Sequence, residues 1–362
     1  MVDLAVEICG MKLRNPVMTA ACPTTRDGDS LVAAAKGGAG ALVTKTISIT
    51  PSVLPRPNLA KVKESLLNAE FGSDLALGRW LSVELAKAKK AGVPLIASIG
   101  YKPGEISELA PKLEAAGADA LELSTHYLGK DVNLVMEVTK AAKEKVKIPV
   151  FVKLSPNVPD IVEVARAAEK AGADGLVAIN TLGACLAIDI ETGRPILGSP
   201  SGYGWQSGPA IKPLAVRCVA DICRAVHVPV IGAGGVSNGK DAVEFMMVGA
   251  TAVQVCTAAI IRGPKVYALI ADEIARFMRA KGYNSIKDLK GIALKHLPEG
   301  PLRTKPKPPE LIVSKCTSCG LCEKYCVYGA IRIIGKIPKI DPSRCTGCGL
   351  CVTVCPSRAL AL

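Results

Sequence analysis

The feature that most constrains the fold is a strand-like segment that recurs eight times between residues 17 and 258. Each segment is a short, continuous run of Val, Ile, Ala and Leu, which is typical of strands buried on both faces of a parallel sheet. Parallel strands need long crossover connections, which are usually helices. The eight segments are residues 17–21, 41–45, 94–100, 120–125, 149–154, 175–181, 229–235 and 252–258.

Amphipathic helix patterns lie between these segments, at residues 105–116, 132–145, 158–171, 211–226 and 242–248. Several of them end in a Gly followed by a small residue, which is the usual chemistry of a helix end before a strand. Eight alternations predict an α/β fold, specifically a (β/α)8 TIM barrel. An open doubly wound sheet is the alternative. It is disfavoured because no glycine fingerprint for a nucleotide follows the first strand.

The chain is long enough for one large domain and a small one. We expect the barrel domain to span residues 1–286. It begins with a short hairpin at residues 3–15, which turns at Gly10–Met11 and comes before the first barrel strand. Residues 287–311 contain five prolines with Lys and Arg between them, which is typical of an extended linker. Residues 312–362 form the remaining domain.

This last domain carries two matched cysteine runs, residues 316–326 and 345–355, each with the spacing C-x2-C-x2-C-x3-C. Cysteines at this spacing hold [4Fe–4S] clusters, whereas zinc sites use two separated pairs. The runs resemble those of two-cluster ferredoxins, in which the fourth cysteine of each run binds the other cluster. One cluster is therefore expected on Cys316, Cys319, Cys322 and Cys355, and the other on Cys345, Cys348, Cys351 and Cys326.

The net charge of +13 makes a nucleic-acid partner worth considering. The basic residues alternate with acidic ones and no basic helix stands out, so an acidic protein partner or a cofactor phosphate is favoured instead. Free thiols together with iron–sulfur clusters favour a reducing cytoplasm. No signal-peptide pattern begins the chain, and the longest apolar run, residues 245–261, is too short to span a membrane. We expect a cytoplasmic protein without nucleic-acid or membrane partners.

Active groups of a TIM barrel lie at the carboxyl ends of its strands. Gly234-Gly235 follows the seventh segment, where such barrels bind phosphate, although a simple tight turn is the alternative. Lys45 and Lys153 end two other segments, and a buried lysine needs an anion nearby. Phosphate, lysines and clusters together indicate flavin mononucleotide (FMN), which converts a two-electron hydride into single electrons.

Several motifs match one family, including Thr44-Lys-Thr-Ile-Ser48, Leu67-Asn-Ala-Glu70 and Lys153-Leu-Ser-Pro-Asn157. With the double cysteine run, they resemble the FMN-binding and C-terminal iron–sulfur part of dihydropyrimidine dehydrogenase, and more distantly dihydroorotate dehydrogenase. The resemblance implies FMN contacts at Ala20, Lys45, Thr46, Lys153, Gly208, Ala233, Gly234, Gly235, Cys256 and Thr257. It implies substrate contacts at Asn68, Glu70, Asn180 and Thr181.

The loop after the fourth segment departs from that family. Ser124 stands where the family has a substrate-binding Asn, and Tyr127 stands where it has a Cys that acts as general acid and base. One hypothesis is that Tyr127 or the neighbouring His126 moves the proton in place of the thiol. The alternative is a shorter connection in which His126 is a satisfied polar residue.

The resemblance implies an FMN- and iron–sulfur-dependent oxidoreductase that transfers hydride between FMN and a small cyclic unsaturated substrate. Electrons would pass through both clusters to a separate FAD/NAD(P) subunit or a ferredoxin, because no second nucleotide fold is present. A homodimer is expected by analogy alone. A dihydroorotate dehydrogenase variant is one alternative, and a non-catalytic electron-transfer subunit is another. The retained Asn68, Glu70, Asn180 and Thr181 argue against the latter.

Overall fold

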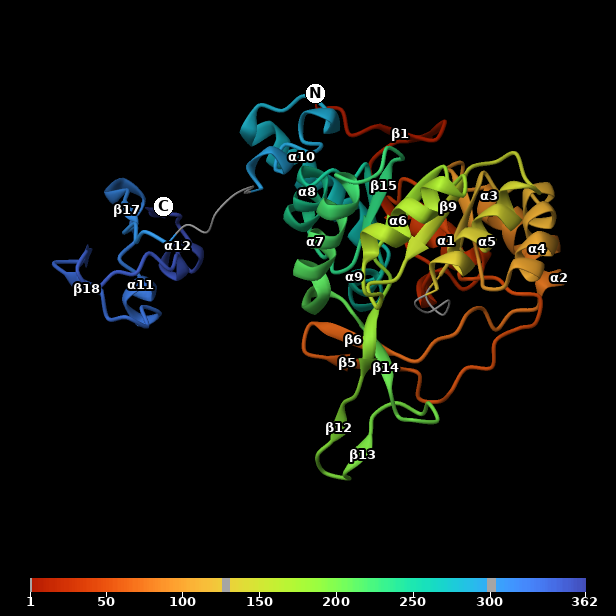
Figure 1. Ribbon diagram of the computed structural model, residues 1–362, viewed down its shortest axis with the longest axis horizontal. Helices are drawn as coiled ribbons and strands as arrows, with labels where there is room; N and C mark the ends of the chain where they lie inside the picture. Colours follow the sequence, from red (N-terminus) through yellow and green to blue (C-terminus); the bar gives the residue numbers. More distant parts are fainter. Residues whose placement is uncertain (1, 126–130, 298–303) are drawn as a thin grey trace. The chain divides into compact units, whose positions relative to one another are not determined.

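The computed structural model describes residues 2–125, 131–297 and 304–362. The chain divides into two compact units, Met1–Leu297 and Pro298–Leu362. Figure 1 shows the ribbon of each unit, with a ring of strands and surrounding helices in the first.

The first unit is built on eight parallel strands in the order β3-β16-β15-β10-β9-β8-β7-β4. A parallel bridge between Met18 and Ala41 joins the two end strands and closes the ring. Each strand falls within one of the eight predicted segments, and the predicted TIM barrel is confirmed. The strands are β3 (Val17–Thr19), β4 (Leu42–Val43), β7 (Leu95–Ile99), β8 (Ala120–Ser124), β9 (Val150–Leu154), β10 (Gly175–Ala178), β15 (Val230–Ala233) and β16 (Ala252–Val255).

Helices surround the barrel and bury their apolar sides against it (Figure 1). Carboxylate or amide side chains cap several of them, since Asp27, Asp131, Asp160 and Asn238 accept hydrogen bonds from N–H groups of the first turn. All five predicted helices are present, with ends shifted by a few residues. The helices are α1 (Gly28–Lys36), α2 (Leu77–Arg79), α3 (Leu85–Lys89), α4 (Pro103–Ala115), α5 (Val132–Lys143), α6 (Ile161–Lys170), α7 (Lys212–Cys223), α8 (Gly239–Met247), α9 (Thr257–Arg262) and α10 (Val266–Lys281).

A hairpin of β1 (Val6–Ile8) and β2 (Met11–Leu13) plugs the amino-terminal end of the barrel. Ile8, Met11 and Leu13 are buried and pack against interior side chains that include Phe151. The turn is at Cys9–Gly10, one residue earlier than predicted. Both residues have positive φ, +48° and +80°, which is the conformation that a two-residue hairpin turn favours.

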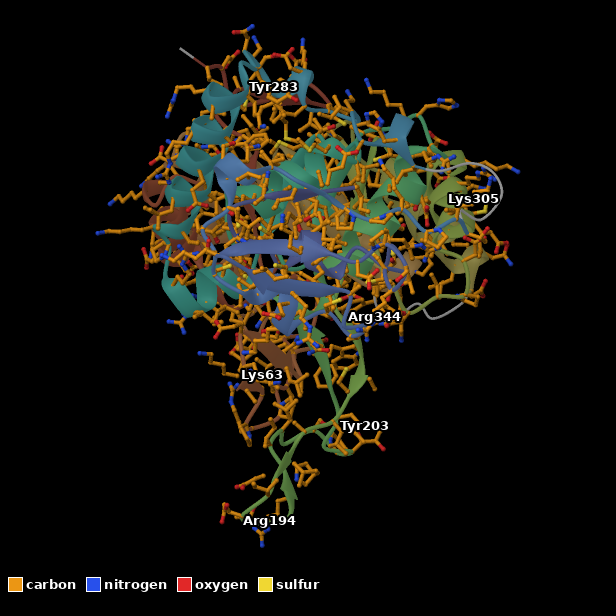
Figure 2. The ribbon with its side chains drawn as sticks, turned by 90° about the vertical axis from the view of Figure 1, so that its left-hand side faces the viewer. Lys63, Arg194, Tyr203, Tyr283, Lys305 and Arg344 are labelled. Atoms are coloured by element: carbon orange, nitrogen blue, oxygen red, sulfur yellow. The ribbon has the colours of Figure 1, made fainter. Side chains whose placement is uncertain are left out.

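A second sheet, which the sequence pattern did not predict, lies at the opposite end. It has the antiparallel order β11-β14-β6-β5, with β5 (Leu59–Val62), β6 (Ser65–Asn68), β11 (Leu182–Cys185) and β14 (Gly204–Ser207). The strands β12 (Ile188–Asp189) and β13 (Arg194–Pro195) extend this sheet into an arm (Figure 2, near Arg194 and Tyr203). Because the sheet grows from the loops after β4 and β10, it brings distant segments to the carboxyl end of the barrel.

The second unit is small and has two antiparallel strand pairs. Strand β17 (Glu310–Leu311) pairs with β20 (Leu360–Ala361), and β18 (Ile331–Ile334) pairs with β19 (Ile337–Ile340). Helices α11 (Leu321–Lys324) and α12 (Leu350–Thr353) each carry part of a cysteine run. The buried side chains of Ile331 and Leu360 form its core with Cys322 and Cys351.

The boundary between the units differs from the predicted linker at residues 287–311. Residues up to Leu297 belong to the first unit, and Leu289 is fully buried there. The N–H groups of Gly291 and Ala293 donate to the carbonyls of Met246 and Met247, both at 2.9 Å. Leu289, Leu294 and Leu297 pack against the core of the first unit and attach this stretch to the barrel. The prolines farther along the predicted linker drew attention away from these apolar side chains.

Within the described ranges, none of the helices combines the length and the apolar character needed to cross a membrane. The apolar run at residues 245–261 is divided between the end of α8, strand β16 and helix α9.

Candidate active site

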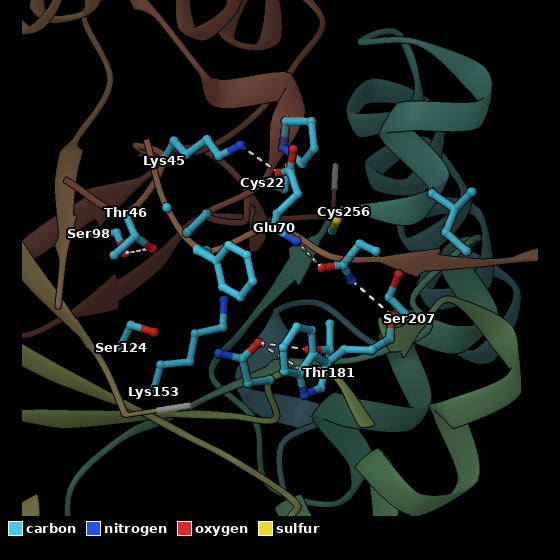
Figure 3. Close-up of a pocket in the computed structure, with 18 of the residues that line it drawn as sticks. Cys22, Lys45, Thr46, Glu70, Ser98, Ser124, Lys153, Thr181, Ser207 and Cys256 are labelled. Carbon is cyan, nitrogen blue, oxygen red and sulfur yellow. Dashed lines mark hydrogen bonds and ion pairs between the residues drawn. The ribbon is translucent and has the colours of Figure 1, made fainter. Parts of the chain in front are cut away.

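Two adjoining pockets open at the carboxyl end of the barrel, and Figure 3 shows residues that line the first of them. Ligand sites of TIM barrels lie at this end. The first pocket contains Lys45, Thr46, Asn68, Glu70 and Ser124. The second contains Ala20, Gly208, Ala233, Gly234, Gly235 and Thr257. Both are lined by Ala21, Lys153, Asn180, Thr181, Ser207 and Cys256. The structure therefore brings together every predicted substrate and FMN residue.

Lys153 lies in the shared wall and is held by two buried partners. Its Nζ donates to Gln254 Oε1 at 2.8 Å and lies 3.4 Å from Glu122 Oε1. Gln254 in turn donates from Nε2 to Glu122 Oε2. All three residues are at most 6% exposed. Glu122 lies two residues before Ser124 on β8 and is a charged residue in an otherwise apolar strand. Its carboxylate pairs with Lys153 on the neighbouring strand β9.

Lys45 is also paired. Its Nζ lies 2.5 Å from Glu70 Oε2, and Asn58 Nδ2 donates to Glu70 Oε1 at 2.7 Å. The anion expected near each lysine is thus supplied by the chain itself, as Glu70 and Glu122. The two lysines and two carboxylates compensate each other within the pocket wall.

Aromatic side chains enclose the first pocket, and the sequence pattern gave no signal for them. Tyr101 donates from its hydroxyl to the Phe71 carbonyl. The Phe71 and Trp205 rings meet edge to face, with centroids 6.2 Å apart. Trp205 comes from β14, so its place in the pocket follows from the second sheet.

Hydroxyl groups line the remaining wall beside Ser124. Thr46 Oγ1 and Ser98 Oγ are 3.1 Å apart, and Thr125 Oγ1 donates to the Lys153 carbonyl at 2.6 Å. The two candidates for proton transfer, His126 and Tyr127, lie outside the described residues.

The second pocket fits the phosphate of FMN, because Gly208, Gly234 and Gly235 line it with backbone that carries no side chains. Gly235 has φ +84°, and a Cβ added there would lie 2.7 Å from Lys212 Cβ and 2.8 Å from the Gly208 carbonyl oxygen. Such a bare, closely packed backbone at the end of the seventh barrel strand is typical of phosphate sites in TIM barrels. Lys153 lines both pockets and so lies where they adjoin.

The second unit gathers its eight cysteines around two further pockets. One is lined by Cys316, Cys319, Cys322 and Cys355, and the other by Cys326, Cys345, Cys348 and Cys351. Each set takes three cysteines from one run and one from the other, as the spacing predicted. Burial, with the nearby cysteines of the same set, raises the pKa of the Cys322 and Cys351 thiols. A bound metal cluster would offset that cost by favouring the thiolates.

The comparisons with known proteins agree with this geometry. Residues 3–278 match the family model "Dihydroorotate dehydrogenase", and residues 315–359 match "4Fe-4S dicluster domain". The dihydroorotate dehydrogenase B (NAD(+)) catalytic subunit of Methanothermobacter thermautotrophicus is 41% identical over 302 residues, which cover 80% of this chain and 98% of that protein. The corresponding subunit of Methanocella arvoryzae is 46% identical over 260 residues, covering 69% and 84%.

A solved DHODH structure from Eimeria tenella, in complex with ferulenol, has the same fold. Its TM-score is 0.68 at 23% identity, and the match covers 82% of this chain and 89% of that one. The family model and the relatives support the dihydroorotate dehydrogenase superfamily. They do not single out dihydropyrimidine dehydrogenase, which the sequence motifs had favoured. The chain belongs to the dihydroorotate dehydrogenase family.

Proposed function

We propose that this chain is the catalytic component of an FMN- and iron–sulfur-dependent oxidoreductase whose substrate pair is dihydroorotate and orotate. The observation that carries the proposal is the match to dihydroorotate dehydrogenase catalytic subunits over nearly their whole length, combined with a pocket at the carboxyl end of the barrel. Bound FMN would supply hydride exchange with the CH–CH bond of the substrate.

The residues of the chain would hold the two reactants against each other. The backbone at Gly208, Gly234 and Gly235 would cradle the FMN phosphate, and Lys153 would stabilise negative charge on the reduced ring. Asn68, Asn180 and Thr181 would orient the substrate. The aromatic wall would keep water away, which strengthens these polar contacts.

The proton that accompanies the hydride needs a donor on the loop after β8. Tyr127 and His126 remain the candidates, with Ser124 lining the pocket just before them. Either side chain can move a proton if it reaches the substrate carbon.

A neutral dihydropyrimidine is the second candidate substrate, and Glu70 favours it. Both lysines of the described pocket wall already face carboxylates, at 2.5 Å and 3.4 Å. Orotate would bring a further carboxylate to this wall, whose two lysines are already paired, whereas uracil and thymine carry no carboxylate. The fold and relatives support the first candidate, and the pocket charge supports the second.

Reoxidation of the reduced flavin separates the two candidates. The reconstituted full chain would be reduced anaerobically, and flavin absorbance followed after adding orotate, uracil or thymine. Recovery with orotate alone supports the first candidate, and recovery with uracil or thymine supports the second. If none of the three pyrimidines restores the flavin absorbance, both candidate substrates are contradicted. The remaining alternative is then a non-catalytic electron-transfer subunit.

We further infer that the second unit holds two [4Fe–4S] clusters that exchange electrons with a separate protein, either an FAD/NAD(P) subunit or a ferredoxin. The two four-cysteine pockets support the number of clusters. Chemical analysis of the reconstituted chain should give about eight irons and eight sulfides per chain. A value near four would contradict the second cluster.

A further inference from the structure

Two cysteines outside the cluster region meet in the wall of the first pocket. Cys22 follows β3 and Cys256 follows β16, and these strands are neighbours in the barrel, with Val255 opposite Thr19. Both cysteines line the pocket, and Figure 3 shows them in the same corner of it. Cys22 is only 4% exposed.

The two thiols are close enough to influence each other and are chemically unequal. The neighbouring Cys256 side chain lowers the pKa of Cys22, although burial opposes this. Thr24 Oγ1, 3.0 Å from Cys22 Sγ, and the charge of Lys153 lower it further. The Cys22 side chain, together with burial, raises the pKa of Cys256. Cys22 is therefore the more acidic thiol of the two, and it is the one that would attack first.

Other thiols of the barrel lack this arrangement. Burial raises the pKa of Cys9 to about 11 and that of Cys223 to about 12. Such thiols are poor nucleophiles at neutral pH, because the thiolate is the reactive form.

We propose that Cys22 and Cys256 form a redox-active dithiol, which a small disulfide oxidises to an intramolecular disulfide in the pocket wall. The thiolate of Cys22 attacks the small disulfide and displaces one of its thiols, giving a mixed disulfide. The sulfur of Cys256, after losing its proton, attacks the Cys22 sulfur and displaces the second thiol. The protein loses two protons and two electrons, and the small disulfide becomes two thiols.

The bond would tie the loop after the first barrel strand to the loop after the last one. Because Cys256 lines both pockets, its oxidation state would alter the wall they share. The chemistry requires neither FMN nor a substrate, so it stands apart from the proposed enzymatic function.

Peptide mapping of the full chain tests the proposal. The native protein would be treated anaerobically with 2-hydroxyethyl disulfide, with and without FMN, then blocked with N-ethylmaleimide and digested with trypsin. Residues 15–26 and 241–262 are tryptic peptides that each contain one cysteine. We expect these two peptides joined and lighter by two hydrogens than their sum. Their recovery as separate blocked thiols would overturn the proposal.

Three variants assign the roles of the two sulfurs. Cys256→Ser should stop the reaction at a mixed disulfide on Cys22. Cys22→Ser should abolish the joined peptide, because Cys256 then has no partner sulfur in the pocket wall. Cys185→Ser, outside both pockets, should leave the joined peptide unchanged. Should a variant fail to fold, the native mapping decides alone, and a joined peptide that forms only after unfolding contradicts the proposal.

Discussion

Removing the carboxylate of Glu122 should destabilise the barrel strongly, because it leaves Lys153 as a buried charge without a counter-ion. Lys153 and Glu122 are 6% and 1% exposed, and Gln254 depends on both for its hydrogen bonds. Breaking a buried pair by removing one partner costs about 3–5 kcal/mol. We therefore expect Glu122→Ala to lower the free energy of unfolding by about that amount.

Denaturant unfolding followed by tryptophan fluorescence measures this change in the full chain. The chain has two tryptophans, Trp80 and Trp205, and both belong to the first unit. The signal therefore reports the barrel and not the cluster region.

Two controls separate the buried pair from a general effect of losing charge. Glu108→Ala breaks the exposed pair between Lys112 and Glu108, and should cost about 0.5 kcal/mol or less. Adding Lys153→Met to Glu122→Ala should cost less than the sum of the single changes, because the uncompensated charge is gone. A loss below about 1 kcal/mol for Glu122→Ala would refute the argument that the pair is buried and coupled.

Three further changes address the ligand sites. Gly235→Ala should lower FMN affinity at least about tenfold, because its Cβ would lie 2.7 Å from Lys212 Cβ and force the backbone to shift. Fluorescence titration of the apoprotein with FMN measures this affinity. An unchanged affinity would count against a phosphate site at Gly235. Cys326→Ser should remove the cluster of one pocket, with iron falling to about half; full iron content would contradict the assigned set. Glu70→Gln should improve recovery of the flavin by orotate relative to uracil, and an unchanged ratio in the same absorbance assay would show that Glu70 does not select by charge.

The barrel could be predicted because its signals are local. Eight continuous apolar runs with helices between them admit few other arrangements, and cysteine spacing fixed both four-cysteine pockets. The predicted ends of elements moved because capping residues such as Asp160 and Asn238 decide them.

The contacts that no pattern revealed are those between distant segments. Pairing of β6 with β14 places Trp205 opposite Asn68, and neither segment has a sequence feature that specifies the other. In the sequence, Glu122 is only a charged residue in an apolar strand. Its role becomes clear in the structure, where it pairs with Lys153 of the neighbouring strand. Cys22 and Cys256 likewise looked like scattered cysteines, since only barrel closure makes their strands neighbours.

The most direct test of the proposed enzymatic function is an anaerobic addition of dihydroorotate to the fully reconstituted, oxidised chain. Flavin absorbance and the electron paramagnetic resonance of the clusters would be followed together. We predict that dihydroorotate bleaches the flavin and that a reduced-cluster signal follows in the same sample. If dihydroorotate leaves both signals unchanged while dithionite reduces them, this chain does not oxidise dihydroorotate.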